Sequence, residues 1–253
     1  MQIQERRRFI LNELNLNGRV YITELAEKTG TSIETARRDV QALEEEGLLT
    51  KIHGGAVKNK TTFQAAFSDR MSHELPQKQL IGKTAATLLH PGDSIFIDCG
   101  STTYAFASCL AGLQNLTVIT NSPLIADTVY QANPSLSIYI TGGQYVGQCR
   151  QNMGTHVLRE ISQYSTDYAF IGAGGIDINA GITAASPEEV EVAKMMAEHS
   201  ANVVVLADHS KFGVTSLCKI VEIEKVSYIV TDEINHEHAS AYSDVGVNVI
   251  VGK

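Results

Sequence analysis

From residue 78 onward, short runs of apolar residues alternate with segments of helical periodicity. The first runs read SIFID at 94–98, LTVIT at 116–120 and LSIYIT at 136–141. Strands that are apolar along their whole length must be buried on both faces, and the intervening helices supply the cover. The alternation therefore predicts an α/β fold, a Rossmann-like parallel sheet with helices on both sides. Further strands are expected at 168–171, 202–207, 226–231 and 247–251, and helices at 78–90, 103–112, 124–131 and 187–199.

Glycines and small polar residues follow five of the expected strands. They form DCGSTT at 98–103, TNS at 120–122, GG at 142–143, GAGGID at 172–177 and DHSK at 208–211. The carboxyl ends of parallel strands meet at one edge of the sheet, where ligands bind in such folds. Amide groups and the dipole at a helix start attract anions. Together the five loops predict a binding site for an anionic small molecule.

Two helical patterns joined by a short polar turn occupy residues 23–43. Gly30 can end the first helix in the left-handed conformation. Thr31 or Ser32 can cap the second helix, and Thr31 with Glu34 matches a capping box. The spacing of apolar residues in the second helix predicts one buried stripe. Its members are Ile33, Ala36, Val40 and Leu43.

The opposite face of the second helix is polar. A short helix, a glycine turn and a helix with exposed arginine and amide groups are typical of a helix-turn-helix that enters the DNA major groove. Two short amphipathic helices also occur in many all-α folds, and an arginine pair can be an ordinary solvated face. Both interpretations stay open on this stretch alone. The polar face consists of Glu34, Thr35, Arg38 and Gln41, with Arg37 on its flank.

The next ten residues favour the DNA-binding interpretation. LLTKIHGGAV at 48–57 predicts two strands joined at Gly54 and Gly55, because a glycine pair supports tight hairpin turns. A hairpin directly after a recognition helix is the wing of a winged helix-turn-helix. Lys51 and His53 lie where such a wing touches DNA phosphates.

The net charge of −8 is unevenly divided along the chain. Residues 1–60 hold ten Lys+Arg and nine Asp+Glu, whereas the other 193 residues hold ten and nineteen. A nearly neutral DNA-binding region must cluster its cations, and its affinity for DNA should fall steeply with salt. The acidic remainder repels DNA. The candidate phosphate contacts are Arg6, Arg7, Arg8, Arg19, Arg37, Arg38, Lys51, Lys58 and Lys60.

A chain of 253 residues is long enough for about two domains. We expect a DNA-binding domain at 1–58, a polar linker at 59–76 and a second domain at 77–253. No apolar run approaches the ~20 residues of a membrane span, so no membrane partner is expected. The cysteines form no C-x-x-C pair, which argues against zinc or a disulfide framework, and no metal or other cofactor is expected. They are Cys99, Cys109, Cys149 and Cys218.

Residues 5–57 resemble the DNA-binding domain of the DeoR family of bacterial transcriptional regulators. The matching features include TARRD at 35–39 and HGGA at 53–56, in the family's order. Ala36 and Lys51 depart from the residues usual in the family. DCGSTT, TNS, GG, FIGAGGID and DHSKFG in the second domain also resemble the DeoR effector domain, which is related to ribose-5-phosphate and glucosamine-6-phosphate isomerase folds.

The resemblance implies a cytoplasmic regulator, usually a repressor of a carbohydrate-utilisation operon, that binds operator DNA as a homodimer or homotetramer. A phosphorylated sugar or sugar derivative is the implied effector. On the recognition helix, Thr35, Arg38 and Gln41 are expected to face bases. The expected phosphate contacts are Arg37, Lys51, His53 and the cluster Arg6, Arg7 and Arg8, and Ser32 is also placed in the DNA-binding set.

The same resemblance gives the effector site. It implies a phosphate loop, a cation at Lys211, and acceptors for sugar hydroxyls at Asp177 and Asp208. Arg70 and Lys78 match family positions of less defined role. The structural alternative for Asp177 is that of a turn residue. The whole expected set is Asp98, Gly100, Ser101, Thr102, Thr103, Asn121, Ser122, Gly142, Gly143, Gly174, Asp177, Asp208, Lys211, Arg70 and Lys78.

Two alternatives remain at this stage. A phosphosugar isomerase needs a carboxylate base near the sugar carbons, and Asp98, Asp177, Glu188 and Glu189 are the possible bases. The isomerases carry an additional acidic cluster where this chain has GAGGID, and an isomerase has no use for a DNA-binding domain. Activation of transcription in place of repression is the other alternative, because operator position decides between them.

Overall fold

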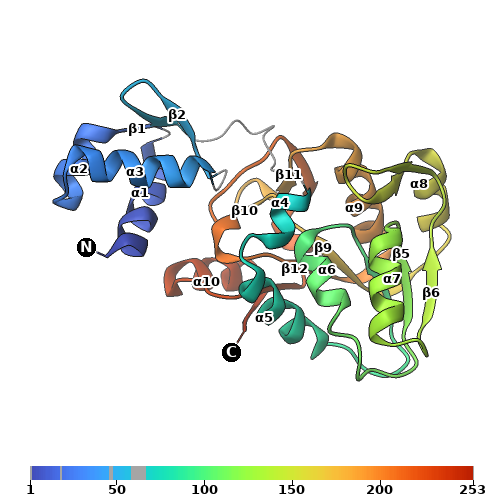
Figure 1. Ribbon diagram of the computed structural model, residues 1–253. Helices are drawn as coiled ribbons and strands as arrows, with labels where there is room; N and C mark the ends of the chain where they lie inside the picture. Colours follow the sequence, from blue (N-terminus) through green and yellow to red (C-terminus); the bar gives the residue numbers. More distant parts are fainter. Residues whose placement is uncertain (1, 18, 46–47, 58–66, 253) are drawn as a thin grey trace. The chain divides into compact units, whose positions relative to one another are not determined.

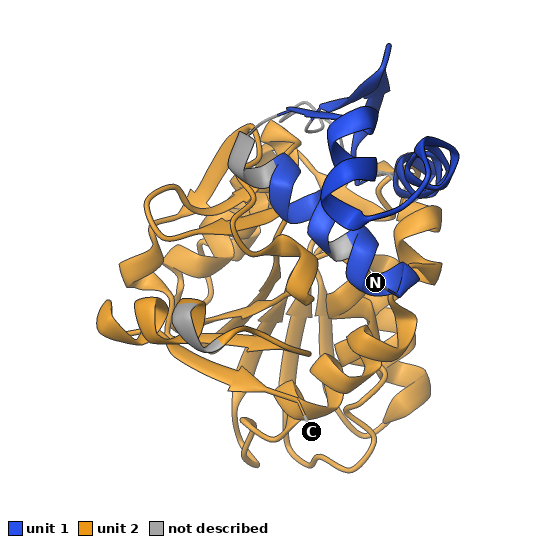
Figure 2. Ribbon diagram, turned by 90° about the vertical axis from the view of Figure 1, so that its left-hand side faces the viewer, with its two compact units in different colours: residues 1–65 blue, residues 66–253 orange. Residues whose placement is uncertain are grey.

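A computed structural model describes residues 2–17, 19–45, 48–57 and 67–252. The chain divides into two compact units, Met1–Ala65 and Ala66–Lys253, coloured separately in Figure 2. The predicted linker at 59–76 extends beyond the boundary between these units, into the second unit. Residues 58–66 lie outside the described part, but helices α4 (Phe67–Ser72) and α5 (Leu75–Ala86) already occupy much of 67–76, and Phe67 is buried.

The first unit is a winged helix-turn-helix, as the sequence predicts. Its three strands pair antiparallel in the order β1-β3-β2, so the short strand before α2 lies against the wing. Side chains of all three helices and of the wing form one core. Ile10, Leu25 and Val40 are its members from the three helices. The elements are α1 (Ile3–Asn17), β1 (Arg19–Tyr21), α2 (Ile22–Thr29), α3 (Ile33–Glu45), β2 (Thr50–Ile52) and β3 (Gly55–Val57).

The turn between α2 and α3 explains how the second helix begins. Gly30 has φ 65° and its N–H donates to the end of α2, a conformation that favours glycine. Ser32 caps α3, because its Oγ accepts the N–H of Thr35 at 3.1 Å. The predicted capping box of Thr31 with Glu34 is wrong, since the Glu34 carboxylate lies beside Arg37 and Arg38 further along the helix.

The predicted buried stripe of α3 is correct from Ala36 to Leu43 but wrong at Ile33. Ile33 is 50% exposed, because it lies at the first helical position, before the helix reaches the core. Asp39 is buried on the inner face, where the periodicity of apolar residues gave no sign of it.

The second unit contains a sheet of seven parallel strands in the order β15-β14-β12-β9-β4-β5-β6. Figure 1 labels four of them, β5, β6, β9 and β12. In this order, β9 is the middle strand of the sheet, and β4 and β12 are its neighbours. The α/β fold class is therefore confirmed. The strands are β4 (Ser94–Ile97), β5 (Thr117–Thr120), β6 (Ser137–Ile140), β9 (Thr166–Gly172), β12 (Ser200–Leu206), β14 (Tyr228–Thr231) and β15 (Asn248–Val251).

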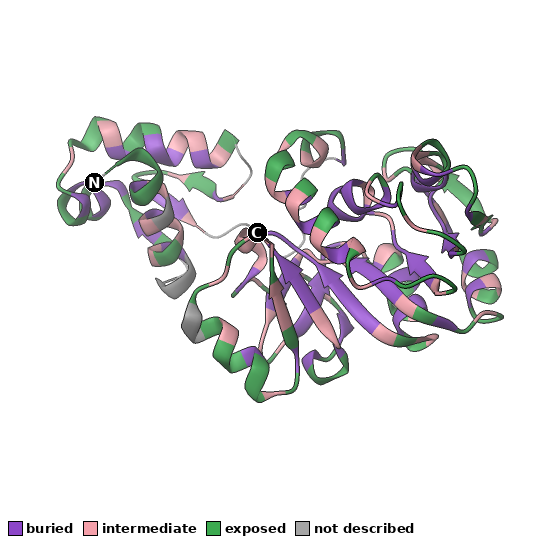
Figure 3. Cartoon of the chain, turned by 90° about the horizontal axis from the view of Figure 1, so that it is seen from below, coloured by how far each residue is buried: buried purple, intermediate pink, exposed green. Residues whose placement is uncertain are grey.

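Helices cover both faces of this sheet, and its five inner strands are mostly buried (Figure 3). Ile95 and Ile97 of β4 pack into a core with α5 (Leu75–Ala86), α6 (Ser101–Ala107) and α7 (Pro123–Ala132). Phe96, which alternates with them, joins the opposite core. That core also includes side chains of α8 (Thr155–Ile161), α9 (Pro187–Glu198) and α10 (His236–Asp244).

Gly82 permits the close approach of α5 and α6, since a Cβ at this position would lie 2.9 Å from the backbone of Phe106. This approach packs the second half of α6 against α5.

Several small elements escaped the sequence analysis because their short strands have no uninterrupted apolar run. Besides α4 (Phe67–Ser72), they comprise a hairpin of β7 (Gln144–Val146) and β8 (Gln151–Met153) and an antiparallel sheet of β10 (Gly175–Asp177), β11 (Gly181–Ala184) and β13 (Cys218–Val221). Within the described ranges, no helix has the length and apolar character needed to cross a membrane.

Candidate nucleic-acid interface and effector site

The outer face of α3 carries its arginines in exposed ion pairs. Glu34 Oε2 accepts a hydrogen bond from Arg37 Nη1 at 3.1 Å, and Glu34 Oε1 lies 3.7 Å from Arg38 Nε. Exposed pairs of this kind contribute little to stability, so the arginines can exchange Glu34 for phosphate at low cost. The sequence predicted that Glu34 lies on this face, but it did not predict that Glu34 forms ion pairs with both arginines.

The wing is tied to the same face. The Lys51 N–H donates to Glu44 Oε1 at 2.9 Å, and Lys51 Nζ donates to Gln41 Oε1. Gln41 Nε2 in turn donates to Glu45. The structure therefore brings the predicted base-facing Gln41 and the predicted phosphate contact Lys51 together. His53 lies exposed in the turn of the wing.

The prediction that Arg6 contacts DNA phosphate is wrong. Arg6 is only 8% exposed and Asp39 only 4% exposed, and they form a bidentate pair between α1 and α3, with Arg6 Nη2 3.2 Å from Asp39 Oδ1. Arg7 is half-buried, with Nε 3.7 Å from Asp39 Oδ1. The side chain of Arg8 and all of Lys58 lie outside the described parts of the chain. A buried carboxylate, not a phosphate, is therefore the partner of Arg6.

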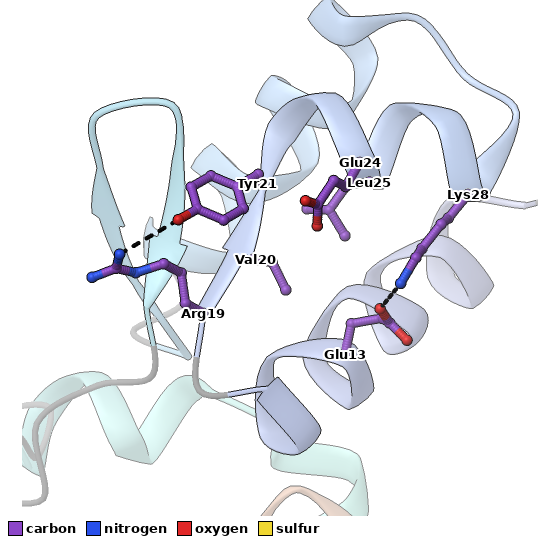
Figure 4. Close-up of a pocket in the computed structure, with 7 residues that line it drawn as sticks. All are labelled: Glu13, Arg19, Val20, Tyr21, Glu24, Leu25 and Lys28. Carbon is purple, nitrogen blue, oxygen red and sulfur yellow. Dashed lines mark hydrogen bonds and ion pairs between the residues drawn. The ribbon is translucent and has the colours of Figure 1, made fainter.

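A surface pocket of about 330 Å³ lies between α1, β1 and α2 (Figure 4). Lys28 Nζ donates to Glu13 across it, and Arg19 Nη1 lies 3.5 Å from the Tyr21 hydroxyl. Its lining includes none of the residues predicted to bind an effector. The pocket belongs to the packing between α1 and α2.

In the second unit, Asp98 directly follows strand β4 and is buried. Its carboxylate accepts the backbone N–H groups of Cys99 and Gly172. Burial, with the nearby charge of Glu189, nevertheless raises the pKa of Asp98 to about 7. Asp98 is thus held at the junction of β4 and β9 as a carboxyl group that titrates near neutrality.

Three residues with hydroxyl groups, Ser101, Thr102 and Thr103, follow Asp98 at the start of α6. Thr103 Oγ1 donates to the Gly100 carbonyl at 3.0 Å, so it fixes the start of α6. Ser101 and Thr102 occupy the first turn of α6 and are also buried. Gly100 before them is extended. The loop is therefore built as a rigid helix start at the carboxyl end of β4.

Asn121 and Ser122 follow β5 and are fully buried. Asn121 Nδ2 donates to Gln151 Oε1 at 2.8 Å and to the carbonyl of Asn152, and Ser122 Oγ donates to the Arg150 carbonyl at 2.7 Å. Both residues therefore hold the β7–β8 hairpin to the sheet edge. Within the described residues, Asn121 Oδ1 is buried without a hydrogen-bond partner.

The predicted glycines and Asp177 have local structural roles. The Gly142 N–H donates to Glu160 Oε2 at 2.8 Å, and Gly143 has φ 116° where a Cβ would lie 2.7 Å from Val157. Gly174 donates to Thr183 in the small sheet. Asp177 Oδ1 accepts the N–H groups of Asn179 and Ala180, at 2.9 and 2.8 Å. This is the turn role that the sequence analysis held as the alternative to ligand binding.

Cations gather around the end of β12. Lys78 is 4% exposed, its Nζ donates to the carbonyls of Arg70 and His73, and burial lowers its pKa to about 8. Asp208 attracts this ammonium group, whereas Lys211 and Arg70 repel it. Burial acts to raise the pKa of Asp208, but Lys211, Ser210 and Lys78 together hold that pKa below its usual value. Lys78, Lys211, Arg70 and Asp208 are therefore one electrostatic cluster.

Comparison with known families agrees with both halves of the structure. Residues 6–62 match the family pattern of the DeoR-like helix-turn-helix domain, and residues 73–233 match that of the DeoR C terminal sensor domain. The chain belongs to the DeoR family. It is a DNA-binding transcriptional regulator with an N-terminal DNA-binding domain and a C-terminal sensor domain.

Its DeoR-family relatives align along most of their length. GolR, an HTH-type transcriptional regulator of Listeria innocua, is 33% identical over 98% of each chain. GlcR, an HTH-type transcriptional repressor of Bacillus subtilis, is 34% identical over 99% of this chain and 97% of its own. The glycerol-3-phosphate regulon repressor of Escherichia coli is 29% identical over 92% of each chain. These relatives are regulators of transcription.

The sensor domain also holds two charged groups that the predicted site set lacks. Glu189 lies in the first turn of α9, where Ser186 Oγ accepts its N–H at 3.3 Å, and its charge acts on Asp98 and on the nearby Cys149. The second is a pair in which His209 Nδ1 lies 2.7 Å from Asp232 Oδ2, which raises the pKa of His209. The sequence named Glu189 only as a possible isomerase base, and no motif marked it as an effector contact.

Proposed function

We propose that this DeoR-family regulator represses a carbohydrate-utilisation operon and leaves its operator when a phosphorylated sugar or sugar derivative binds the sensor domain. The observation that carries the proposal is the cation cluster of Arg70, Lys78 and Lys211 at the sheet edge that also holds Asp98. The relative named for glycerol-3-phosphate supports the ligand class, because that name specifies a phosphorylated polyol.

The cation cluster suits an anionic group. Burial is the main cause that lowers the pKa of Lys78, and the positive charges of Lys211 and Arg70 act in the same direction, whereas Asp208 and Glu74 oppose them. A dianionic phosphate beside these groups stabilises their charged forms, so bound phosphate should raise the pKa of Lys78 from about 8. The phosphate is assigned to this end of the site, where Ser101 and Thr102 also lie in the adjoining helix start.

A second part of the site, around Asp98 and Glu189, suits hydroxyl groups. Asp98 and Glu189 are carboxyl groups close enough for one to raise the pKa of the other. A sugar hydroxyl that donates to either carboxylate separates the two like charges and replaces lost hydration. The buried Asn121 Oδ1, unpartnered among the described residues, offers a further acceptor at the end of β5. We therefore assign the polyhydroxylated part of the effector to this part of the site.

Two recognition helices are needed to read a two-part operator. Homo-oligomers with two-fold symmetry place equivalent helices on half-sites separated by about one turn of DNA. We propose a homodimer or homotetramer whose effector-bound form misplaces the two winged domains. A coupling of about 1–3 kcal/mol per site changes operator occupancy by about 5- to 150-fold.

A thermal-shift panel on the purified full chain tests this proposal. The probes are sugar and polyol phosphates, each paired with its unphosphorylated parent, and inorganic phosphate alone. A ligand at ~100 times its Kd adds about 2.7 kcal/mol of stability. We expect a shift with one or a few phosphorylated compounds only, and the same compounds should release operator DNA in a mobility-shift assay.

Two variants separate the functions. Lys211→Ala should lose the thermal shift and keep operator binding, whereas Arg38→Ala should keep the shift and lose operator binding. If no phosphorylated compound shifts the melting temperature or releases the DNA, the effector assignment is overturned. If both variants lose both activities, the division of labour between the domains is overturned.

Isomerase activity is the second candidate function. The observation that favours it is Asp98, a carboxyl group with a pKa of about 7 beside Glu189, since a general base works best when its pKa is near ambient pH. Conversion of an aldose phosphate into its ketose, measured with the wild-type chain and absent in Asp98→Asn, would establish it. Stable binding of the sugar phosphate without turnover would reject it.

A further inference from the structure

Ile33 is the first residue of α3 and its side chain is half exposed. The apolar core of the DNA-binding domain includes Ala36, Val40 and Leu43 of the same helix but not Ile33. Leaving half of a branched aliphatic side chain in water gives up part of the free energy of its burial. The fold therefore does not account for an isoleucine at this position.

The polar side chains around Ile33 are committed to one another. Ser32 Oγ accepts the N–H of Thr35 and lies 2.8 Å from the Thr35 hydroxyl, and Glu34 binds Arg37. These bonds fix the backbone of the first turn. An isoleucine in a helix has one strongly preferred χ1 rotamer, so its methyl groups point in a defined direction at low entropic cost.

The position of Ile33 on the helix relates it to the DNA-facing residues. Ile33, Arg37 and Gln41 are spaced by four residues and lie in one row along α3 (Figure 1 labels the helix). That row ends at the wing, because Gln41 accepts from Lys51. Ile33 is thus the apolar start of a row whose other members are a cation and an amide.

The first residues of a recognition helix in the helix-turn-helix arrangement contact base edges in the major groove. The base edges there present hydrogen-bonding groups and one apolar group, the 5-methyl of thymine, which aliphatic side chains contact. We propose that Ile33 is a specificity-determining residue that packs on the 5-methyl group of a thymine in each operator half-site. The proposal rests on operator binding by this regulator and names a base that the binding reads.

Replacement of thymine by deoxyuridine removes this methyl group and nothing else. An operator duplex obtained by selection from random sequence with the full chain is the starting material. Each thymine is then replaced singly, and Kd is measured at fixed salt. We expect one position per half-site at which deoxyuridine weakens wild-type binding about fourfold, the equivalent of about 0.8 kcal/mol for one methyl group, and about fifteenfold with both half-sites replaced.

Three variants make the result specific to residue 33. Ile33→Ser should weaken binding to the thymine operator and abolish the deoxyuridine penalty at that one position, whereas Ile33→Val should keep the penalty. Ile3→Ser is the matched control, since Ile3 is 58% exposed on α1 of the same domain and should leave all penalties unchanged. Melting temperatures of the variants confirm that they are folded.

The outcomes separate this inference from the function that it rests on. Sequence-selective binding with deoxyuridine penalties that are the same in wild type and Ile33→Ser overturns the assignment of Ile33 and leaves operator binding intact. Selective binding without any deoxyuridine penalty does the same. Failure of the wild-type chain to select any sequence at low salt overturns operator binding and the thymine contact together.

Discussion

The two functional regions of this regulator hold their charged groups in opposite ways. On α3, Glu34, Arg37 and Arg38 are exposed and paired within one helical turn. At the sheet edge of the sensor domain, Asp98 and Lys78 are buried, and their side chains are bonded to backbone groups. Exposed charges are weakly held and can exchange partners with a polyanion. Buried charges are fixed before the ligand arrives, and their cost appears as shifted pKa values.

The DNA-binding domain also contains a buried ion pair, between Arg6 and Asp39. We expect the largest effect of a substitution on stability at this pair. Asp39→Ala removes the carboxylate of the buried bidentate pair between Arg6 and Asp39, which should lower the free energy of unfolding of this domain by about 3–5 kcal/mol. Peptide-resolved hydrogen exchange on the full chain would report it as faster exchange in α1 and α3.

Lys28→Ala is the matched control for Asp39→Ala, because Lys28 also joins two helices of this domain, through Glu13, but is half exposed. We expect it to cost less than about 1 kcal/mol. The double variant Arg6→Met with Asp39→Leu should recover much of the loss, since apolar residues replace a buried ion pair well. If Asp39→Ala lowers the free energy of unfolding no more than Lys28→Ala does, the buried Arg6–Asp39 pair contributes no more to stability than an exposed ion pair.

Asp98 should make the stability of the sensor domain depend on pH. Burial raises its pKa from 3.8, the ordinary value for an aspartate side chain, to about 7, so between these values the folded state holds a proton that the unfolded state has lost. This contribution to stability is complete below pH 3.8 and disappears as pH rises to about 7. The difference between the two pKa values corresponds to about 4 kcal/mol at most.

Asp98→Asn tests that linkage, because an amide oxygen can still accept the backbone bonds of Cys99 and Gly172. We expect the variant to melt at a higher temperature than the wild type at pH 8, with a much smaller difference at pH 5. Circular dichroism melts at both pH values measure it. Equal differences at both pH values would show that Asp98 does not titrate in this range.

The sequence predicted features that depend on neighbouring residues. The turn at Gly30, the wing at Gly54 and the apolar strands followed from local spacing, because a turn or an amphipathic face needs only a few adjacent residues. Arg6 was misplaced because its partner Asp39 is 33 positions away, and a lone arginine suggests a surface. Ile33 was misplaced because periodicity gives the buried side of a helix but not where the core ends along it.

The sensor site was predictable in outline and not in its contacts. The strand-end loops were found because parallel strands bring their carboxyl ends together, whatever the side chains are. Which side chains face the site depends on packing across the sheet. Glu189 reaches Asp98 from a helix start 91 positions later, and Asp177, which lies in a matching motif, is used in its own turn.

The smallest expected effect belongs to Glu34, and it sharpens the contrast between exposed and buried pairs. Glu34→Gln removes a carboxylate that competes with phosphate for Arg37 and Arg38. The free energy of unfolding should change by no more than about 0.5 kcal/mol, and the Kd for duplex DNA of unrelated sequence should fall about twofold at low salt. Binding titrations over a range of salt concentrations measure this change. A loss of affinity confined to operators with one particular C·G pair would contradict it, because Glu34 would then be accepting a hydrogen bond from a cytosine amino group.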